Sequence, residues 1–437
     1  MTKKVNGFSR LSKEQKINWL VKTYLNNSQE AKNRLTQYWN SDEKLQKLHD
    51  EFIENTLTNF YLPLGIAPNF NINGKMFAIP MVIEESSVIA AASKTSKYWG
   101  ERGGFKAEVL STEKVGQVHF TYSGNVAELN KFFASVKPKF FSDSKKITAN
   151  MKKRGGGILD IELRDKTEAL PDYFQLHCTF ETLDAMGANF INTCLEQFAA
   201  TLNREFKTYQ TGQNIAGKLE VVMSILSNYV PHCLVKASVS CPVERFTAGN
   251  IAPELFAKKF VQAVRIAEAE PYRAVTHNKG IMNGIDAVVL ATGNDFRAIE
   301  AGIHAYASRD GQYRSLSKAK VVDGVFTFLM TIPLALGTVG GLTKLHPLVK
   351  LNMEILGNPT AKELMEIVAV AGLAQNFAAI KALTTTGIQK GHMKMHLMNI
   401  LNEYQATEAE KTAAIHHFEK NTVSQSAVRE LLEGLRK

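Results

Sequence analysis

The sequence predicts an α+β fold in which a large, helix-rich domain is interrupted by a small ferredoxin-like domain. Residues 112–227 carry strand and helix patterns in the order β-α-β-β-α-β, which is that of a ferredoxin-like unit. The chain after this stretch is rich in Ala, Val and Leu at helical spacing, and it ends in charged amphipathic helices. We therefore expect four segments: residues 1–111 and 228–387, which form the large domain, the inserted domain of residues 112–227, and a C-terminal helical appendage of residues 388–437.

The first 111 residues predict helices on either side of a hairpin. In LSKEQKINWLVKTYL the apolar residues recur at helical spacing, and Ser12 with Gln15 resembles a capping box. The tetrapeptide NING lies before the apolar run KMFAIPMVI, which is typical of a hairpin turn. After EESS, the stretch SVIAAASKTSKYWG predicts a helix.

In the inserted domain, six patterns follow one another. Strands are expected at VGQVHFTYSG, GGGILDIEL, DYFQLHCTFETLD and LEVVMSILSNY. Helices are expected at NVAELNKFFASV and MGANFINTCLEQFAATLNREF. No GxGxxG follows a strand, so the Rossmann dinucleotide fingerprint is absent.

The run GVFTFLMTIPLALGTVGGLT, residues 324–343, is long and uncharged enough to cross a membrane. Pro333 and three glycines interrupt it, however, which favours a buried strand followed by a Gly-rich turn. The N-terminal sequence has basic residues but no apolar core of signal-peptide length. We expect no membrane partner and a cytoplasmic protein.

The basic composition is compatible with binding to nucleic acid or to a phosphorylated small molecule. The net charge of +10 includes basic clusters in KPKFFSDSKK and MKKR, which could bind nucleic acid or a phosphorylated small molecule, or could be a solvated face. No RRM, KH or zinc-finger pattern supports nucleic-acid binding. Four cysteines are too few for a disulfide framework and suit a reducing cytosol, and without CxxC or Cys/His spacing we expect no metal.

Four features could carry chemistry, and each has a plainer interpretation. Glu84 and Glu85 end an apolar run before a helix; they could complement the helix dipole, or one could donate a proton from an apolar pocket. His392 could be a surface residue or a general acid on a mobile flap. The segment DAMGAN, residues 184–189, could be a tight turn or a phosphate site at a helix N-terminus. Asp160 could accept from a ribose hydroxyl, although the signal is weak.

Taken together, several motifs resemble those of the class II, bacterial-type 3-hydroxy-3-methylglutaryl-coenzyme A (HMG-CoA) reductases. The matching motifs, in the order of the family, are EESSVIAAAS, RGGGILDIE, DAMGANFINT, PYRAVTHNKGIMNGIDAVVLATGNDFRAIEAGIHAYASRDGQYR, AGLAQNFAAIKAL and GIQKGHM. The resemblance covers nearly the whole chain. It implies an NAD(P)H-dependent reductase that converts HMG-CoA to mevalonate and CoA with two NADH or NADPH, and whose small domain binds the dinucleotide.

The resemblance also implies roles for individual residues. Glu85, Lys279, Asp295 and His392 match the catalytic positions, with His392 on a C-terminal flap. The substrate's glutaryl part is expected at Ser87, Arg273, Asn283 and Gln375. The dinucleotide is expected at Asp160, Asp184, Met186, Gly187, Ala188 and Asn189.

The chain departs from the family pattern at four places. Ser86 replaces a proline in EESS, ENTLT at residues 54–58 lacks the glycine of the family's motif, GGLT carries Leu342, and Ser9 stands where an arginine is usual. The last change puts one contact with a CoA phosphate in doubt. The rival enzyme, an acyl-CoA lyase or thiolase-like protein, would need a nucleophilic cysteine, and no cysteine lies beside a convincing base in the sequence. Whether the coenzyme is NADH or NADPH, in which direction the reaction runs in the cell and how large the oligomer is are left open.

One segment raises a geometric question. THNKGIMNGIDAVVLATGNDFRAIEAGIHAYASRDG, residues 276–311, is apolar yet holds Lys279, Asp286 and Asp295. If residues 280–308 formed one helix, Lys279 and Asp295 would be about 24 Å apart along it, because each residue advances about 1.5 Å. The family resemblance implies that both residues act in one site, so our hypothesis is a homodimer in which Lys279 of one subunit meets Asp295 of its partner. Core helices near the dimer axis would also explain the apolar composition.

Overall fold

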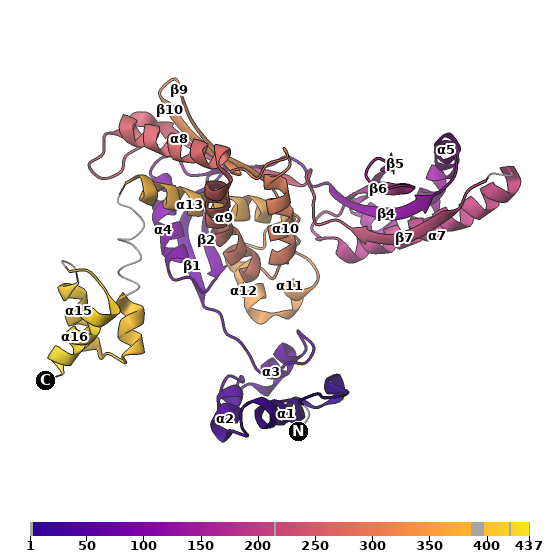
Figure 1. Ribbon diagram of the computed structural model, residues 1–437. Coiled ribbons are helices and arrows are strands. Elements are labelled where there is room, and N and C mark those ends of the chain that lie inside the picture. Colours follow the sequence, from indigo (N-terminus) through magenta and orange to yellow (C-terminus); the bar gives the residue numbers. More distant parts are fainter. Residues whose placement is uncertain (1–2, 214–215, 386–396, 419–420, 437) are drawn as a thin grey trace. The chain divides into compact units, whose positions relative to one another are not determined.

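A computed structural model describes residues 3–213, 216–385, 397–418 and 421–436, and its secondary structure mixes helices with three sheets (Figure 1). By contacts the chain separates into two compact units, Met1–Pro63 and Leu64–Lys437. Buried apolar residues form three clusters, all in the second unit: one in the large domain, one in the inserted domain and one among the C-terminal helices.

The first unit consists of short helices: η1 (Phe8–Arg10), α1 (Lys13–Tyr24), α2 (Gln29–Gln37) and α3 (Glu43–Asp50). The predicted capping box at α1 is confirmed, since Ser12 and Gln15 exchange both hydrogen bonds. Lys13 joins α1 to the end of α3 through an ion pair of 2.7 Å with Asp50.

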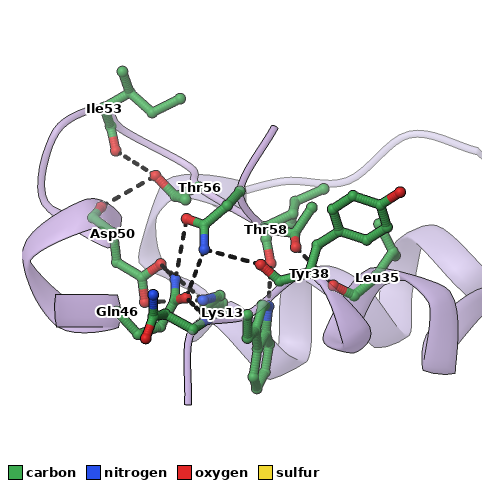
Figure 2. Close-up of polar contacts among 12 residues, drawn as sticks. Lys13, Leu35, Tyr38, Gln46, Asp50, Ile53, Thr56 and Thr58 are labelled. Atoms are coloured by element: carbon green, nitrogen blue, oxygen red, sulfur yellow. Dashed lines mark hydrogen bonds and ion pairs between the residues drawn. The ribbon is translucent and has the colours of Figure 1, made fainter. Parts of the chain in front are cut away.

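The same unit contains the ENTLT departure from the family pattern. Thr58 Oγ1 donates to the carbonyl of Leu35 at 2.6 Å, and Thr56 Oγ1 donates to those of Asp50 and Ile53 (Figure 2). The threonine hydroxyls therefore satisfy backbone carbonyls around the turn, which accounts locally for threonine in place of glycine at residue 58.

The predicted hairpin is confirmed. Strands β1 (Leu64–Ile72) and β2 (Lys75–Val82) pair antiparallel, and the turn between them is Asn73–Gly74 with φ of 52° and 87°. Two positive φ values are what a two-residue type I′ turn requires, and Asn-Gly is the pair that adopts them at least cost. Helix α4 (Ser87–Gly100) follows β2 as expected and packs against β1.

The large domain is built on a second sheet and three long helices. The sheet has the order β3-β8-β10-β9, with β3 (Lys106–Val109), β8 (Leu234–Pro242), β9 (Ser317–Val322) and β10 (Val325–Pro333). The helices are α8 (Pro253–Ala269), α9 (Pro271–Ala291) and α13 (Ala361–Thr384); η2 (Val243–Arg245), α11 (Leu342–Leu345) and α12 (Pro347–Ile355) are shorter. Strand β10 confirms the prediction that residues 324–343 begin as a buried strand and continue into a Gly-rich segment.

The expectation of one continuous helix over residues 280–308 is wrong. Helix α9 ends at Ala291, and α10 (Phe296–Ala307) starts after four residues. Gly293 adopts φ of +66°, which ends the helix, and the Asp295 side chain caps α10 by accepting from the N–H groups of Arg297 and Ala298. The apolar sides of α9 pack against α13, β2 and α8 of the same chain, so no dimer axis is needed to explain its composition.

The inserted domain has the predicted β-α-β-β-α-β order. Its sheet is antiparallel with the order β5-β6-β4-β7, which is the ferredoxin-like arrangement. The strands are β4 (Lys114–Tyr122), β5 (Gly157–Asp165), β6 (Tyr173–Glu181) and β7 (Leu219–Leu226), and the helices are α5 (Val126–Asp143), α6 (Lys145–Lys153) and α7 (Ala188–Gln213). Helix α6 was not predicted as a separate element. The domain boundaries given above stay a prediction.

The C-terminal residues are helical where they are described. Residues 397–403 form a helix, followed by α15 (Glu408–His417) and α16 (Gln425–Leu435). Within the described ranges, only α13 has the length and composition of a membrane span, and two thirds of its most apolar window, 67%, is buried in the protein. Burial of that kind is usual for the core helix of a large domain.

Candidate active site

A cavity of about 940 Å³ lies among α4, α9, α13 and the loop of residues 248–251. Six of the residues expected to act on the substrate line it, and they come from three helices that are far apart in the sequence and from the turn before α4. These residues are Glu85, Ser87, Arg273, Lys279, Asn283 and Gln375.

The centre of the cavity is an ion pair between Glu85 and Lys279. Lys279 Nζ lies 3.2 Å from Glu85 Oε2, and Ser87 Oγ donates to Glu85 Oε1 at 2.9 Å. Glu85 precedes α4 and Lys279 lies in the middle of α9, so packing of α4 and α9 in the core brings them together. The Lys279 side chain is 64% exposed and that of Glu85 33% exposed, which leaves both accessible to a ligand in the cavity.

The wall beside this pair carries a half-buried guanidinium. Burial lowers the pKa of Arg273, and among the described residues no carboxylate forms an ion pair with it. Gln375 is buried and donates to the carbonyl of Val88, which ties α13 to α4. An uncompensated cation at the wall of a cavity favours an anionic ligand.

Asp295 does not line this cavity. Its carboxylate caps α10 and pairs with Arg297 at 3.0 Å. Asn294 N–H donates to the carbonyl of Val289, so the start of α10 is held at the end of α9. Since Val289 is ten residues beyond Lys279, Asp295 lies about 15 Å away along α9. The break in the helix shortens the separation but does not bring the two side chains of one chain together.

Asp286 lies in the same apolar segment as Lys279, and its sequence motif assigns it no role. This residue lies on α9, and burial followed by the neighbouring Glu300 raises the pKa of its carboxyl to about 8. The side chain is therefore largely protonated at neutral pH, and it does not line the cavity. The position of the aspartate inside an apolar helical stretch is the sequence signal that could have identified a buried carboxyl group.

The DAMGAN loop joins β6 to α7, where a dinucleotide phosphate was expected. Gly187 has φ of +95°, and a Cβ there would lie 2.5 Å from Thr182 Cγ2, so only glycine fits. Met186, Ala188 and Asn189 flank it where α7 begins, and the free N–H groups of a first helical turn suit an anion. The loop and helix start therefore fit a dinucleotide phosphate.

Asp184 makes a contact that the sequence did not indicate. Its carboxylate accepts from the N–H of Ala361 at 2.8 Å and so caps the N-terminus of α13, while its carbonyl accepts from the N–H of Thr338. The DAMGAN loop is thus bonded to the helix that carries Gln375. Binding of the dinucleotide by the Asp184 side chain stays a prediction.

Asp160 lies on β5 of the inserted domain, about half exposed. Lys137 of α5 lies 2.7 Å from its carboxylate and holds the pKa of Asp160 below its usual range. His392, the fourth predicted catalytic residue, is outside the described residues.

The fold and the cavity define a class: a two-domain α+β enzyme in which a carboxylate–lysine pair faces a large ligand cavity. The family model for hydroxymethylglutaryl-coenzyme A reductase matches residues 14–397. The 3-hydroxy-3-methylglutaryl-coenzyme A reductase of Archaeoglobus fulgidus is 36% identical over 438 residues, which are 100% of this chain and 95% of that protein. The probable enzyme of Borreliella burgdorferi is 33% identical, over 96% of this chain and 94% of its own.

Solved structures of reductases of this family are also similar to this chain. The reductase of Streptococcus pneumoniae has a TM-score of 0.73 and 36% identity, covering 98% of this chain and 99% of that one. A class II structure from the same organism, bound to NADPH in open conformations, has a TM-score of 0.72 and 38% identity over 87% of this chain and 99% of its own. The chain belongs to the hydroxymethylglutaryl-coenzyme A reductase family. It is an NAD(P)H-dependent oxidoreductase of the mevalonate pathway.

Proposed function

We propose that the cavity is where this oxidoreductase reduces HMG-CoA to mevalonate and CoA, with Glu85 and Lys279 as catalytic residues. The observation that carries the proposal is the ion pair of 3.2 Å between them, in the same cavity as Arg273, which has no carboxylate partner among the described residues. A dicarboxylate-derived acyl group presents one free carboxylate, which Arg273 can bind while the thioester lies against Lys279. Ser87, Asn283 and Gln375 line the same cavity and would hold the rest of the acyl group.

The residue types suit the reaction. Two molecules of NAD(P)H, bound one after the other, would each supply one hydride: the first to the thioester carbonyl, and the second to the aldehyde that remains once CoA has left. Lys279 offers a fixed positive charge to the oxygen that becomes negative, and such stabilisation is usually the largest catalytic contribution. Glu85, already bonded to Lys279 and Ser87, can deliver a proton to that oxygen at the aldehyde stage. His392 would protonate the departing CoA thiolate.

On the inserted domain, Met186, Gly187, Ala188 and Asn189 would hold the dinucleotide phosphates, and Asp160 the adenosine ribose. The fit of the loop and helix start supports this assignment, as does the NADPH bound to the relative from Streptococcus pneumoniae. Lys137 pairs with Asp160 and offers a cation to a ribose 2′-phosphate, so this site can favour either coenzyme according to which side chain faces the ribose.

We also propose that the active protein is a cytoplasmic homodimer with shared sites. Asp295 caps α10 beyond the end of α9, where Val289 is about 15 Å along the helix from Lys279, so a partner's Asp295 would have to complete each site. The test mixes the Lys279→Ala and Asp295→Ala variants after unfolding and refolds them together. Random pairing gives hybrids with one intact site, and about a quarter of wild-type activity should return. If the mixture stays inactive while refolded wild type recovers, both residues act from one chain.

The reaction itself is tested by the loss of NADPH or NADH absorbance on addition of HMG-CoA, with mevalonate as product. A nucleic-acid-binding protein would show no such loss and would instead retain DNA or RNA. A thiolase-like enzyme is disfavoured because all four cysteines are buried. Burial raises the pKa of Cys194 to about 12 and that of Cys233 to about 11, so neither thiol readily becomes a nucleophile.

A further inference from the structure

Two cations contact one aromatic ring, that of Tyr98, at the wall of the cavity. Lys381 Nζ, near the end of α13, lies 4.0 Å from the centroid of the Tyr98 ring on α4. The guanidinium carbon of Arg102 lies 3.7 Å from the same centroid. Tyr98 and Lys381 both line the cavity. The ring therefore fixes the Lys381 side chain through a cation–π contact.

The two cations differ in their other partners. Arg102 donates to the carbonyls of Tyr98 and Arg245 and to the hydroxyl of Thr247, so its hydrogen-bonding groups are largely occupied. Lys381 is half-buried, and its pKa is lowered by burial and then by the charge of Arg102. Within the described part of the chain, no carboxylate forms an ion pair with Lys381. A bound anion would supply the missing countercharge.

The position of Lys381 in the cavity indicates which anionic group of a ligand could reach it. Along α4, Tyr98 is eleven residues beyond Ser87, which corresponds to about 16 Å at 1.5 Å per residue. In a CoA thioester about thirteen bonds separate the sulfur from the nearest phosphorus, and an extended chain advances about 1.2 Å per bond, or about 16 Å in all. A thioester bound near Ser87 with its arm extended along α4 therefore places its first phosphate beside Tyr98 and Lys381.

We propose that Lys381, held on the face of Tyr98, binds a phosphate of the CoA pyrophosphate and selects CoA thioesters over thioesters without a nucleotide. This inference rests on the proposed function, because it takes the acyl end of the substrate to lie at Glu85 and Lys279. It assigns Lys381 a role in substrate specificity and none in the chemical steps.

The experiment compares Lys381→Met with wild type on three substrates: HMG-CoA, HMG-4′-phosphopantetheine and HMG-pantetheine. Methionine matches the four-atom apolar stem of lysine and can pack on the ring, but it removes the charge. The KM should rise about tenfold for the two phosphate-bearing substrates, as expected when one charge-assisted hydrogen bond is lost. The KM for HMG-pantetheine and the kcat for all three should not change, and Lys381→Arg should restore the KM for HMG-CoA.

The matched control is Lys320→Met, which removes one exposed charge from β9 outside the cavity lining. It should leave all three KM values unchanged. An equal rise in KM for all three substrates with Lys381→Met would mean that Lys381 shapes the cavity without binding phosphate. No rise for any substrate would also refute the proposal.

Titration calorimetry with CoA and with pantetheine needs no turnover, so it separates this proposal from the proposed function. CoA should bind Lys381→Met about tenfold more weakly than wild type, while pantetheine binding stays equal. A wild type that binds CoA in this way without oxidising NAD(P)H would overturn the proposed reaction but keep the phosphate site. Tyr98→Phe should retain CoA binding and Tyr98→Leu should weaken it, because the ring holds the lysine.

Discussion

The cavity of the large domain and the surface of the inserted domain both carry many charges, but they compensate them differently. On the inserted domain, exposed cations pair with carboxylates: Lys137 with Asp160, Lys139 with Glu205 and Arg204 with Asp143. Around the cavity, burial lowers the pKa of Arg273 and Lys381, and neither has a carboxylate partner in the described part of the chain.

This difference distinguishes charges that are already neutralised within the protein from charges that a bound ligand would neutralise. Exposed pairs contribute little to stability, because water screens them and side chains lose freedom when they pair. An uncompensated half-buried cation costs free energy in the empty protein, and the cost is offset when an anion binds. The unpaired cations therefore identify the binding surface more clearly than the number of charges does.

The largest expected effect is at Arg273. Arg273→Met should raise the KM for HMG-CoA by about 10- to 100-fold, because a charged partner of the substrate's carboxylate is lost. The same change should increase the free energy of unfolding of the empty protein by up to about 1 kcal/mol, since a half-buried cation is replaced by a shorter, unbranched apolar side chain. Steady-state kinetics and urea unfolding measure the two effects. A variant that loses both substrate affinity and stability would contradict the comparison.

The next effect concerns the coenzyme. Asp160→Ser removes the carboxylate but leaves Lys137, which should shift the ratio of kcat/KM for NADPH to that for NADH upward by about tenfold, the size of one charge-assisted contact. Lys137→Met should shift the ratio in the opposite direction. An unchanged ratio in both variants would place the adenosine ribose elsewhere.

A smaller effect is expected from the carboxyl of Asp286, whose pKa is raised to about 8 mainly by burial. Between about pH 4 and pH 8 the folded state keeps a proton that the unfolded state has released, so the free energy of unfolding falls as pH rises. The Asp286→Asn variant should not show this decline. The difference between its free energy of unfolding and that of wild type should therefore grow from pH 5 to pH 8. Urea unfolding across this range measures it; parallel pH profiles would contradict the assignment. Glu300→Gln should move the decline to lower pH, because the charge of Glu300 also raises this pKa.

A structural feature could be predicted from the sequence when the residues that determine it are adjacent in the chain. The Asn73–Gly74 hairpin and the capping box at Ser12 follow from a few adjacent residues, so the sequence predicted both. The break between α9 and α10 also had a local signal, Gly293 followed by the cap Asp295, but the apolar periodicity on both sides hid it. The contact of Tyr98 with Lys381 depends on how α4 packs against α13, and spacing in the sequence cannot predict that.

The smallest expected effect tests the departure EESS, which lies at the edge of the cavity. Ser86 has φ of −59°, within the range that a proline ring imposes, and its side chain makes no capping hydrogen bond to α4. Ser86→Pro should therefore fit the folded backbone and stabilise the protein by about 0.4–1 kcal/mol, because the unfolded chain loses conformational freedom. The cavity residues are unchanged, so the KM for HMG-CoA should stay the same. Ser86→Ala, which keeps the ordinary backbone, is the control and should leave stability nearly unchanged. A loss of stability in Ser86→Pro would contradict this expectation. It would mean that the turn before α4 needs the backbone freedom or the N–H group of a residue other than proline.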